Sequence, residues 1–269
     1  MFANARMYSI DATVATHWRA LLEWVVARAG VPIEVIDYPP PQPLPALWQR
    51  TDAACVQMCG YPLLGAMPQP IPIAAVVPSP ARYAHAPVYW TDLVVRTDGP
   101  CATPTDVLGW RMAYTSEQSQ SGYQAVRRFF ADYAAGAGTS RLFEAVIGPL
   151  VTPMKVVHAV IAGEVDVGPL DSYAHDLLRR HVPELAGQLR IIATTRPTPM
   201  PAFVAARGTP EHVVTALREA LLAVAHSPAM DATRDALLIE RFASVDAADY
   251  EVLSRLAAEA DALGYPRLQ

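Results

Sequence analysis

Residues 114–123 read Tyr-Thr-Ser-Glu-Gln-Ser-Gln-Ser-Gly-Tyr and join a predicted strand, residues 110–115, to a predicted helix that begins at Ser121. Hydroxyl side chains therefore gather where the first backbone N–H groups of a helix lack partners and the helix dipole is positive. Gly122 lets the backbone come close to a ligand. This combination predicts a site for a phosphate, phosphonate, sulfate or carboxylate group. The alternative is that Ser119 or Ser121 only caps the helix.

A second segment, residues 162–174, reads Ala-Gly-Glu-Val-Asp-Val-Gly-Pro-Leu-Asp-Ser-Tyr-Ala. Asp171 follows the apolar strand predicted at 165–170, and open α/β sheets bind ligands at the carboxyl ends of their strands. Asp171 is therefore a candidate ligand-binding residue. Alone, it is equally well explained as the N-cap of the next helix.

Strands and helices alternate around these two segments. Further strands are predicted at 5–10, 33–38, 53–59, 71–77, 90–96 and 190–195, and further helices at 14–29, 153–162, 247–263 and after Pro210. The proline-rich residues 39–48 are interpreted as a rigid loop before a short helix, and less favourably as a polyproline ligand for a partner domain. The alternation predicts an α/β fold with open, largely parallel sheets.

The composition describes a globular chain. The 269 residues, 52% of them hydrophobic and 17% charged, suffice for about two units at ~150 residues each. A net charge of −5 lacks the basic field of a nucleic-acid-binding protein, and there is no polybasic membrane patch. Apolar runs are too short for a spanning helix, and the first residues do not form a secretory signal. We expect neither nucleic-acid binding nor direct membrane insertion.

Common catalytic and cofactor motifs are missing. The three cysteines, Cys55, Cys59 and Cys101, form no Cys-x-x-Cys pair, and the seven histidines form no metal-ligand set. Residues 136–138 begin a Gly-x-Gly without its third glycine, and Lys155, the only lysine, has no glycine-rich loop before it. There is no Gly-x-Ser-x-Gly elbow. We predict no cofactor, no metal and no catalytic residue.

Taken together, the motifs resemble the phosphate/phosphonate-binding-like family of type 2 periplasmic solute-binding proteins, which are components of ABC transporters. Residues 105–113 resemble the family's Asp-Leu-x-Gly-Lys-x-hydrophobic-Ala sequence, and residues 119–123, termed the anion loop below, resemble its Ser-x-Ser-Gly-Tyr motif. Residues 159–172 resemble its Ala-Val-x-x-Gly-x-Ala-Asp-Val…Asp-Ser stretch. Residues 59–62 and Tyr89 are similar in placement to cleft-lining aromatic positions of the first lobe.

The resemblance implies a two-lobed α/β fold, each lobe a mostly parallel sheet flanked by helices. Lobe 1 would comprise residues 1–95 and 196–269, and lobe 2 residues 96–195 with the anion loop. Two hinge crossovers would lie near residues 94–98 and 193–197. Closure of the lobes around a small anion would provide the contacts by which the ligand favours the closed state.

The resemblance also implies roles for individual residues. Hydroxyls and amides of the anion loop would hold the anionic head of the ligand. Tyr61, Tyr89 and Trp90 would cover it from the first lobe. Asp171 would accept a hydrogen bond from, or form an ion pair with, a protonated ligand group. The predicted ligand-binding residues are Tyr61, Tyr89, Ser119, Gln120, Ser121, Gly122, Tyr123 and Asp171.

Some residues depart from the family pattern. Phosphonate binders of the family carry a Ser-His pair where this chain has Thr152-Pro153, so the ligand need not be a phosphonate. His158, on the helix that follows, is interpreted as a surface or structural residue. Arg127 and Arg128 are interpreted as a solvated helix face rather than as ligand clamps.

We therefore expect a monomeric, non-enzymatic solute-binding protein for a small anionic or zwitterionic ligand, a phosphate- or phosphonate-like oxyanion compound, with an ABC transporter permease as its partner. The alternative is a cytoplasmic enzyme on the same fold, acting on a small carboxylate or phosphate-bearing metabolite. A third, weaker possibility is an effector-sensing domain. The family resemblance predicts the periplasm, whereas the missing signal predicts the cytoplasm if Met1 is the true start.

Overall fold

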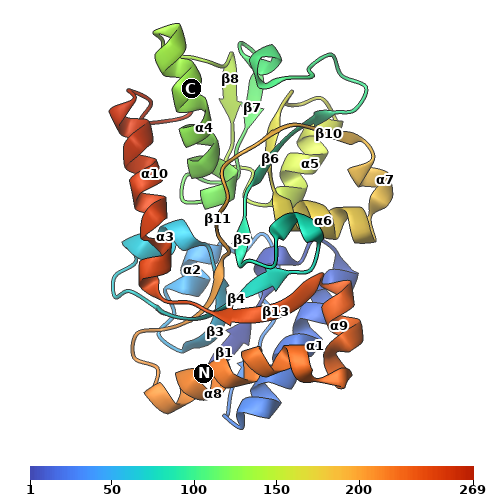
Figure 1. Cartoon of the computed structure of the whole chain (residues 1–269), viewed down its shortest axis with the longest axis vertical. Helices are drawn as coiled ribbons and strands as arrows, with labels where there is room; N and C mark the ends of the chain where they lie inside the picture. The colour runs from blue at the N-terminus through green and yellow to red at the C-terminus, as the bar shows by residue number, and fades with distance from the viewer. The chain divides into compact units, whose positions relative to one another are not determined.

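The computed structural model describes residues 1–269, which form two compact units (Figure 1). Unit 1 comprises Met1–Val88 and Pro199–Glu251, and unit 2 comprises Tyr89–Thr198 and Val252–Gln269. The chain therefore changes unit three times, once more than predicted. The first two changes also lie a few residues away from the predicted crossovers, at the short paired strands β5 (Val88–Tyr89) and β11 (Thr198–Pro199).

The sheet of unit 1 is mixed. Its strand order is β13-β4-β12-β3-β1-β2. The strands are β1 (Phe2–Asn4), β2 (Glu34–Val35), β3 (Ala53–Met58), β4 (Ile71–Pro78), β12 (Ala202–Ala205) and β13 (Ile239–Ser244). β1 is parallel to β2 and β3, but β12 is antiparallel to β3 and β4, and β13 is antiparallel to β4. The predicted mostly parallel sheet is wrong here, because the returning strand β12 enters the sheet in the opposite direction.

The helices of unit 1 include the two long ones predicted at 14–29 and after Pro210. The helices are α1 (Ala12–Ala29), α2 (Leu44–Trp48), α3 (Gly60–Gly65), α8 (Glu211–Ala223) and α9 (Asp231–Ala236). The Asp11 side chain caps α1 by accepting a 2.7 Å hydrogen bond from the Val14 amide, and Gly30 ends the helix in the left-handed conformation. Helix α1 packs on α8 and α9 (Figure 1).

Strand β6 (Thr91–Arg96) is the middle strand of the main sheet in unit 2. It lies between β9 (Gly168–Asp171) and β10 (Leu189–Thr194) and is antiparallel to both. Only β7 (Arg111–Ala113) and β8 (Ala145–Ile147) pair in parallel, and a bridge from Met112 to Val167 continues that pair. The expectation of a mostly parallel sheet is therefore wrong for unit 2 as well.

Helices cover both faces of this sheet. They are α4 (Ala125–Ala137), α5 (Pro153–Ile161), α6 (Ser172–His181), α7 (Pro183–Ala186) and α10 (Glu251–Ala262). Leu93 and Val95 of β6 share a core with Val126 and Phe130 of α4. Helices α5 and α6 contact β6 and β9, and Figure 1 shows α5 and α6 on the side of β6 away from α4. None of the helices has the length and hydrophobicity needed to span a membrane.

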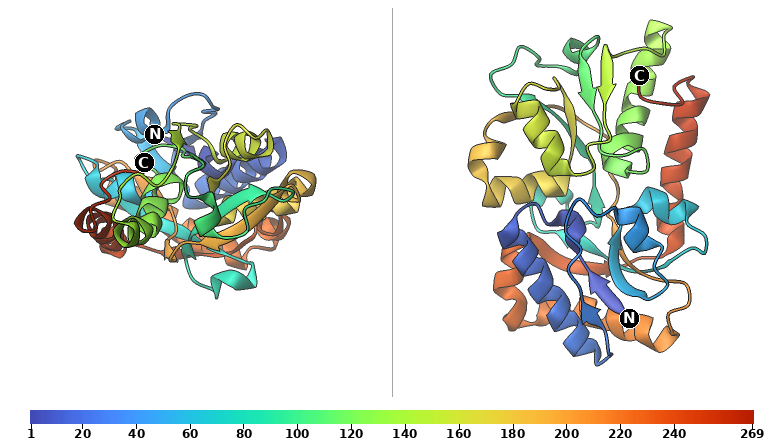
Figure 2. Two further views of the ribbon diagram at one scale, coloured as in Figure 1. Left: turned by 90° about the horizontal axis from the view of Figure 1, so that it is seen from above. Right: turned by 180° about the vertical axis from the view of Figure 1, so that it is seen from behind.

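The C-terminal segment belongs to unit 2, not to the lobe predicted for it. Figures 1 and 2 show α10 alongside α4, and Tyr265 and Leu268 are buried in the core of unit 2. The Arg127 guanidinium, 3% exposed, donates hydrogen bonds to the carbonyls of Ala257 (3.0 Å) and Tyr265 (3.1 Å), and pairs with Asp261. The prediction of a solvated Arg127 is therefore also wrong. An amphipathic pattern identifies a buried helix face but not the core that it covers.

Arg127→Ala should lower the free energy of unfolding by about 2–4 kcal/mol, because two buried carbonyls lose their charged donor. Hydrogen exchange of the α10 amides should also become faster. Denaturant unfolding and hydrogen-exchange mass spectrometry measure the two effects. The control is Arg255→Ala, at an exposed position of α10, which should change the free energy of unfolding by less than about 0.5 kcal/mol. Unchanged exchange in α10 would contradict the assignment.

Candidate functional site

Two helices begin at one edge of the main sheet of unit 2. The anion loop leads into α4, and α6 begins directly after Asp171, the last residue of β9. Between them, β6 begins at Thr91, which is the ladder partner of Asp171. Helix N-termini offer unpartnered amide donors and a positive dipole end. This edge is therefore the candidate anion site in unit 2.

Thr91 connects the three segments at this edge. Its hydroxyl donates a 2.7 Å hydrogen bond to the backbone carbonyl of Ser121 in the anion loop. Its amide donates to the Thr195 hydroxyl (3.0 Å), and its carbonyl accepts from the Thr195 amide (2.9 Å). Thr91 is completely buried, so its hydrogen bonds meet little competition from bulk water. The sheet edge therefore holds the anion loop in place.

Asp171 is both a helix cap and a link to the anion loop. One carboxylate oxygen accepts hydrogen bonds from the amides of Tyr173 (2.9 Å) and Ala174 (3.1 Å). The other accepts a longer, 3.3 Å bond from the Ser121 hydroxyl. The N-cap alternative is confirmed for Asp171. The link to Ser121 brings together the two residues that the sequence singled out from separate motifs.

The anion loop forms a turn of π-helix, Gln120–Gln124, ahead of α4. The Gln124 amide donates to the Ser119 carbonyl (3.0 Å), and the Ser119 hydroxyl accepts from the Gly122 amide (2.9 Å). Ser119 is therefore the cap that the sequence offered as its alternative role. The half-buried Ser121 contacts Asp171 instead.

Gly122 is required by a close approach rather than by its backbone angles. A Cβ atom at this position would lie 1.8 Å from the Thr115 hydroxyl oxygen and 2.9 Å from the Ser119 hydroxyl oxygen. The Gly122 carbonyl in turn accepts a hydrogen bond from the Thr115 amide. Only glycine lets the strand that ends near Thr115 and the π-helical turn pack at this distance.

Tyr123 lies in the core of unit 2. Its hydroxyl oxygen accepts a 3.2 Å hydrogen bond from the Leu268 amide, and its ring meets Tyr114 edge-on at 5.4 Å. Burial raises the pKa of Tyr123, and the Leu268 amide offsets only part of this increase. Burial also raises the pKa of Tyr114, with a smaller contribution from Glu117. Ligand contact by Tyr123 stays a prediction, and its hydroxyl already has a partner in the core.

The predicted aromatic residues belong to different units. Tyr89 and Trp90 lie in unit 2, not in the first lobe as predicted, and Tyr89 is 1% exposed. Tyr61 is a partly exposed residue of α3 in unit 1. The roles of Tyr61, Tyr89 and Gln120 in ligand binding stay predictions.

Sequence reasoning missed three polar residues of this edge: Thr91, Ser172 and Thr195. Each is buried, and the Ser172 hydroxyl accepts a 3.1 Å hydrogen bond from the Trp90 amide. Thr91 begins β6, and Ser172 and Thr195 directly follow β9 and β10. The signal available in the sequence was therefore a hydroxyl residue at the boundary of an apolar strand, which needs a hydrogen-bonding partner when it is buried.

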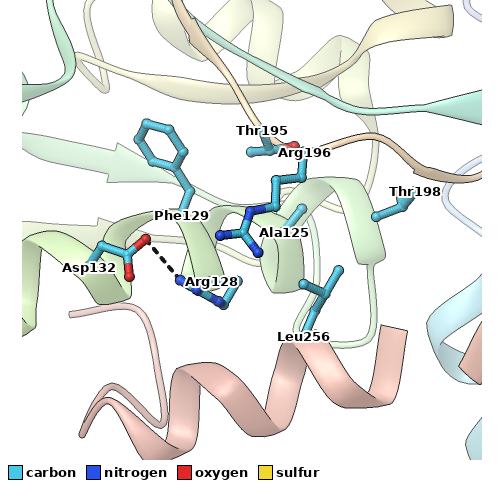
Figure 3. A pocket seen from close by; sticks show the side chains of 8 residues that line it. All are labelled: Ala125, Arg128, Phe129, Asp132, Thr195, Arg196, Thr198 and Leu256. Carbon is cyan, nitrogen blue, oxygen red and sulfur yellow. Dashed lines mark ion pairs between the residues drawn. The ribbon is translucent and has the colours of Figure 1, made fainter. Parts of the chain in front are cut away.

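A pocket beside α4 is a weaker candidate for an anion site. Its lining residues, drawn in Figure 3, are Ala125, Arg128, Phe129, Asp132, Thr195, Arg196, Thr198 and Leu256. Arg128 pairs with Asp132 (3.0 Å) and with Glu259 (2.7 Å), and Arg196 lies 3.7 Å from Glu259. The acidic partners offset these positive charges. The Arg128 side chain is 12% exposed, so its predicted solvated role is wrong too. No group of three acidic, His or Cys side chains is arranged to hold a metal ion.

Residues 10–250 match the family model described as ABC transporter, phosphonate, periplasmic substrate-binding protein. No individually curated protein matches the sequence significantly. Many solved structures do match. A binding protein component of an ABC phosphonate transporter from Pseudomonas aeruginosa has a TM-score of 0.79 at 15% identity, covering 98% of this chain and 87% of that chain.

Two further structures match over nearly their whole length. PhnD1 from Prochlorococcus marinus, in complex with methylphosphonate, has a TM-score of 0.76 at 16% identity, covering 97% of this chain and 98% of that chain. A Xanthomonas citri protein bound to ATP has a TM-score of 0.67 at 18% identity, covering 98% of each chain. These similarities confirm the two-lobed α/β fold of type 2 periplasmic binding proteins.

Gly122→Ala should destabilise the protein by about 1–3 kcal/mol, because the added methyl group overlaps the Thr115 hydroxyl. Adding Thr115→Gly to this variant should restore part of the loss. Thermal unfolding of the purified variants measures the effect. The control is Gly136→Ala, in an open position of α4, which should stabilise by about 0.5–1 kcal/mol. Equal effects at the two glycines would show that the close approach is not decisive.

Proposed function

Because the chain belongs to the periplasmic substrate-binding family of ABC phosphonate transporters, we propose that it binds a small phosphonate or related oxyanion at the sheet edge of unit 2. The single observation that carries this proposal is the 3.3 Å contact between Ser121 of the anion loop and Asp171 at the start of α6. It places a hydroxyl donor and a carboxylate acceptor side by side at two helix N-termini.

This pair suits a ligand that carries both a negative and a protonated group. The Ser121 hydroxyl has one hydrogen, and in this structure it donates it in a hydrogen bond to the Asp171 carboxylate. An incoming oxyanion competes with Asp171 for the hydrogen bond from Ser121, and the bond to the oxyanion is charge-assisted. Asp171 is then able to accept a hydrogen bond from a protonated group of the ligand, either an amine or an acidic hydroxyl. The site therefore favours aminoalkyl phosphonates and singly protonated phosphonates.

The overall charge of the protein does not oppose this ligand class. The net charge is −5, but the proposed contacts use amides and hydroxyls at helix ends, whose dipoles act over the first turn. Solvent and salt screen the more distant acidic side chains. A local positive potential is thus compatible with an acidic protein.

The family also suggests the cellular role. We propose that the protein works in the periplasm, delivers its ligand unchanged to the permease of an ABC transporter, and acts as a monomer. The predicted closure of the lobes on the ligand stays a prediction, as do the contacts of Tyr61 and Tyr89.

Ser121→Ala should weaken the binding of methylphosphonate at least tenfold, because a hydrogen bond to a charged group is lost. Isothermal titration calorimetry measures the affinity. Ser254→Ala, at an exposed position of α10, is the matched control and should bind like the unmodified protein. Unchanged affinity in Ser121→Ala would refute the placement of the anion. Absence of binding to phosphonates, phosphate and sulfate in the unmodified protein would refute the proposed ligand class.

Asp171→Asn should weaken the binding of 2-aminoethylphosphonate more than the binding of methylphosphonate, because only 2-aminoethylphosphonate brings an ammonium group to the carboxylate. The ratio of the two affinities should change by about tenfold, comparable to one hydrogen bond to a charged group. Asparagine is itself a good helix cap, so α6 should remain intact. Equal weakening of the binding of both ligands would show that the amine does not contact Asp171. Circular dichroism of the variant checks that its fold is unchanged.

A further inference from the structure

Trp90 and Asp92 lie on the side of β6 opposite to Thr91. Successive side chains of a strand alternate between faces, so Thr91 faces the anion loop while its two neighbours face α6. The indole Nε1 of Trp90 donates a 3.0 Å hydrogen bond to one carboxylate oxygen of Asp92. A hydrogen-bonded polar pair therefore lies at the start of β6, directly before the apolar residues 93–95.

His175 completes this pair from α6. It lies one helical turn after Asp171, and its Nδ1 is 2.9 Å from the second carboxylate oxygen of Asp92. The two side chains are 1% and 0% exposed. With Asp92 ionised, its oxygens only accept hydrogen bonds, so Nδ1 is the donor in this contact. The Nε2 atom of His175 is buried without a hydrogen-bonding partner. A buried polar atom of this kind is costly and calls for a compensating role.

We propose that the buried Asp92–His175 pair is a positioning element that fixes the indole of Trp90 at the ligand-binding edge. The Trp90 backbone is held on the same edge, since its amide donates to the Ser172 hydroxyl and its carbonyl accepts from the Ser172 amide (2.9 Å). Ser172 directly follows Asp171, and the Trp90 side chain is partly exposed. Hydrogen bonds thus hold Trp90 both at its backbone and at its indole nitrogen.

A fixed indole has a consequence for the choice of ligand. The indole lies on the α6 side of β6, where its apolar surface can contact an organic substituent that extends from the phosphonate toward α6, whereas inorganic phosphate has no such group. Holding the ring in advance avoids part of the entropy lost when a side chain is ordered on binding. We therefore expect Trp90 to favour methylphosphonate over phosphate. This part of the inference rests on the proposed function, but the positioning of the ring does not.

The first experiment tests the positioning without any ligand. The full chain is labelled with ¹⁵N-tryptophan, and the indole N–H signal of Trp90 is assigned from its absence in Trp90→Phe. In the unmodified protein we expect this signal to be shifted downfield and protected from exchange, as a hydrogen bond to a carboxylate requires. In His175→Leu it should move upfield and exchange faster. In His175→Asn, whose amide can replace Nδ1 as the donor, it should stay near its original position.

A purely structural role for the pair predicts a different result. In that case His175→Leu would lower the melting temperature but leave the Trp90 indole signal and its exchange unchanged, which would overturn the proposal. An equal disturbance of the Trp90 and Trp110 signals would also overturn it, because the effect would then be global. If His175→Leu does not fold, Asp92→Asn tests the same bond, since a neutral acceptor should shift the indole signal upfield.

The second experiment measures the preference for methylphosphonate over phosphate by calorimetry. We expect His175→Leu to lower this preference about tenfold, as for one lost hydrogen bond to a charged group, and to have no further effect when Trp90 is already replaced by Phe. An equal effect in both backgrounds would refute an action through Trp90. If the unmodified protein binds no phosphonate, phosphate or sulfate, the proposed function fails, while the indole signals still decide whether the pair positions Trp90.

Discussion

The hydrogen bonds of Thr91 are the constraint on which the candidate site depends. This buried residue lies at the first position of the middle strand. It is hydrogen-bonded to Ser121 of the anion loop and to Thr195, which directly follows β10. Its ladder partner is Asp171. Strand pairing, the loop and the start of α6 are thereby set by a single position. A change that moved Thr91 would displace the donor and the acceptor of the proposed site together.

Local signals in the sequence were sufficient to find much of this arrangement. The serine-rich turn before a helix and the aspartate after an apolar strand both depend on residues that are close in sequence, and the structure places Ser121 and Asp171 in contact. What the sequence could not separate was capping from ligand binding, because both use the same oxygen atoms. Ser119 is a cap in the structure, and Asp171 combines capping with the contact to Ser121.

The errors concern pairings between residues that are far apart in sequence. Alternating strands and helices favour parallel sheets, but β12 and β6 run antiparallel to their neighbours. The same limit applies to the C-terminal helix, whose apolar face fits either core, and to Arg127, whose partners lie more than 100 residues away. Asp92 and His175 are likewise 83 residues apart, so neither is conspicuous without coordinates.

The position of the C-terminal segment in unit 2 also affects when this unit can fold during synthesis. The core of unit 2 contains Tyr123 and Phe130 together with Leu268, and the Leu268 amide donates to the Tyr123 hydroxyl. Synthesis proceeds from the N-terminus, so the segment with the anion loop leaves the ribosome well before the residues that complete its core. Unit 2 therefore cannot finish folding during translation of its own central segment. The core around Tyr123 is therefore completed only after residues 252–269 have been synthesised.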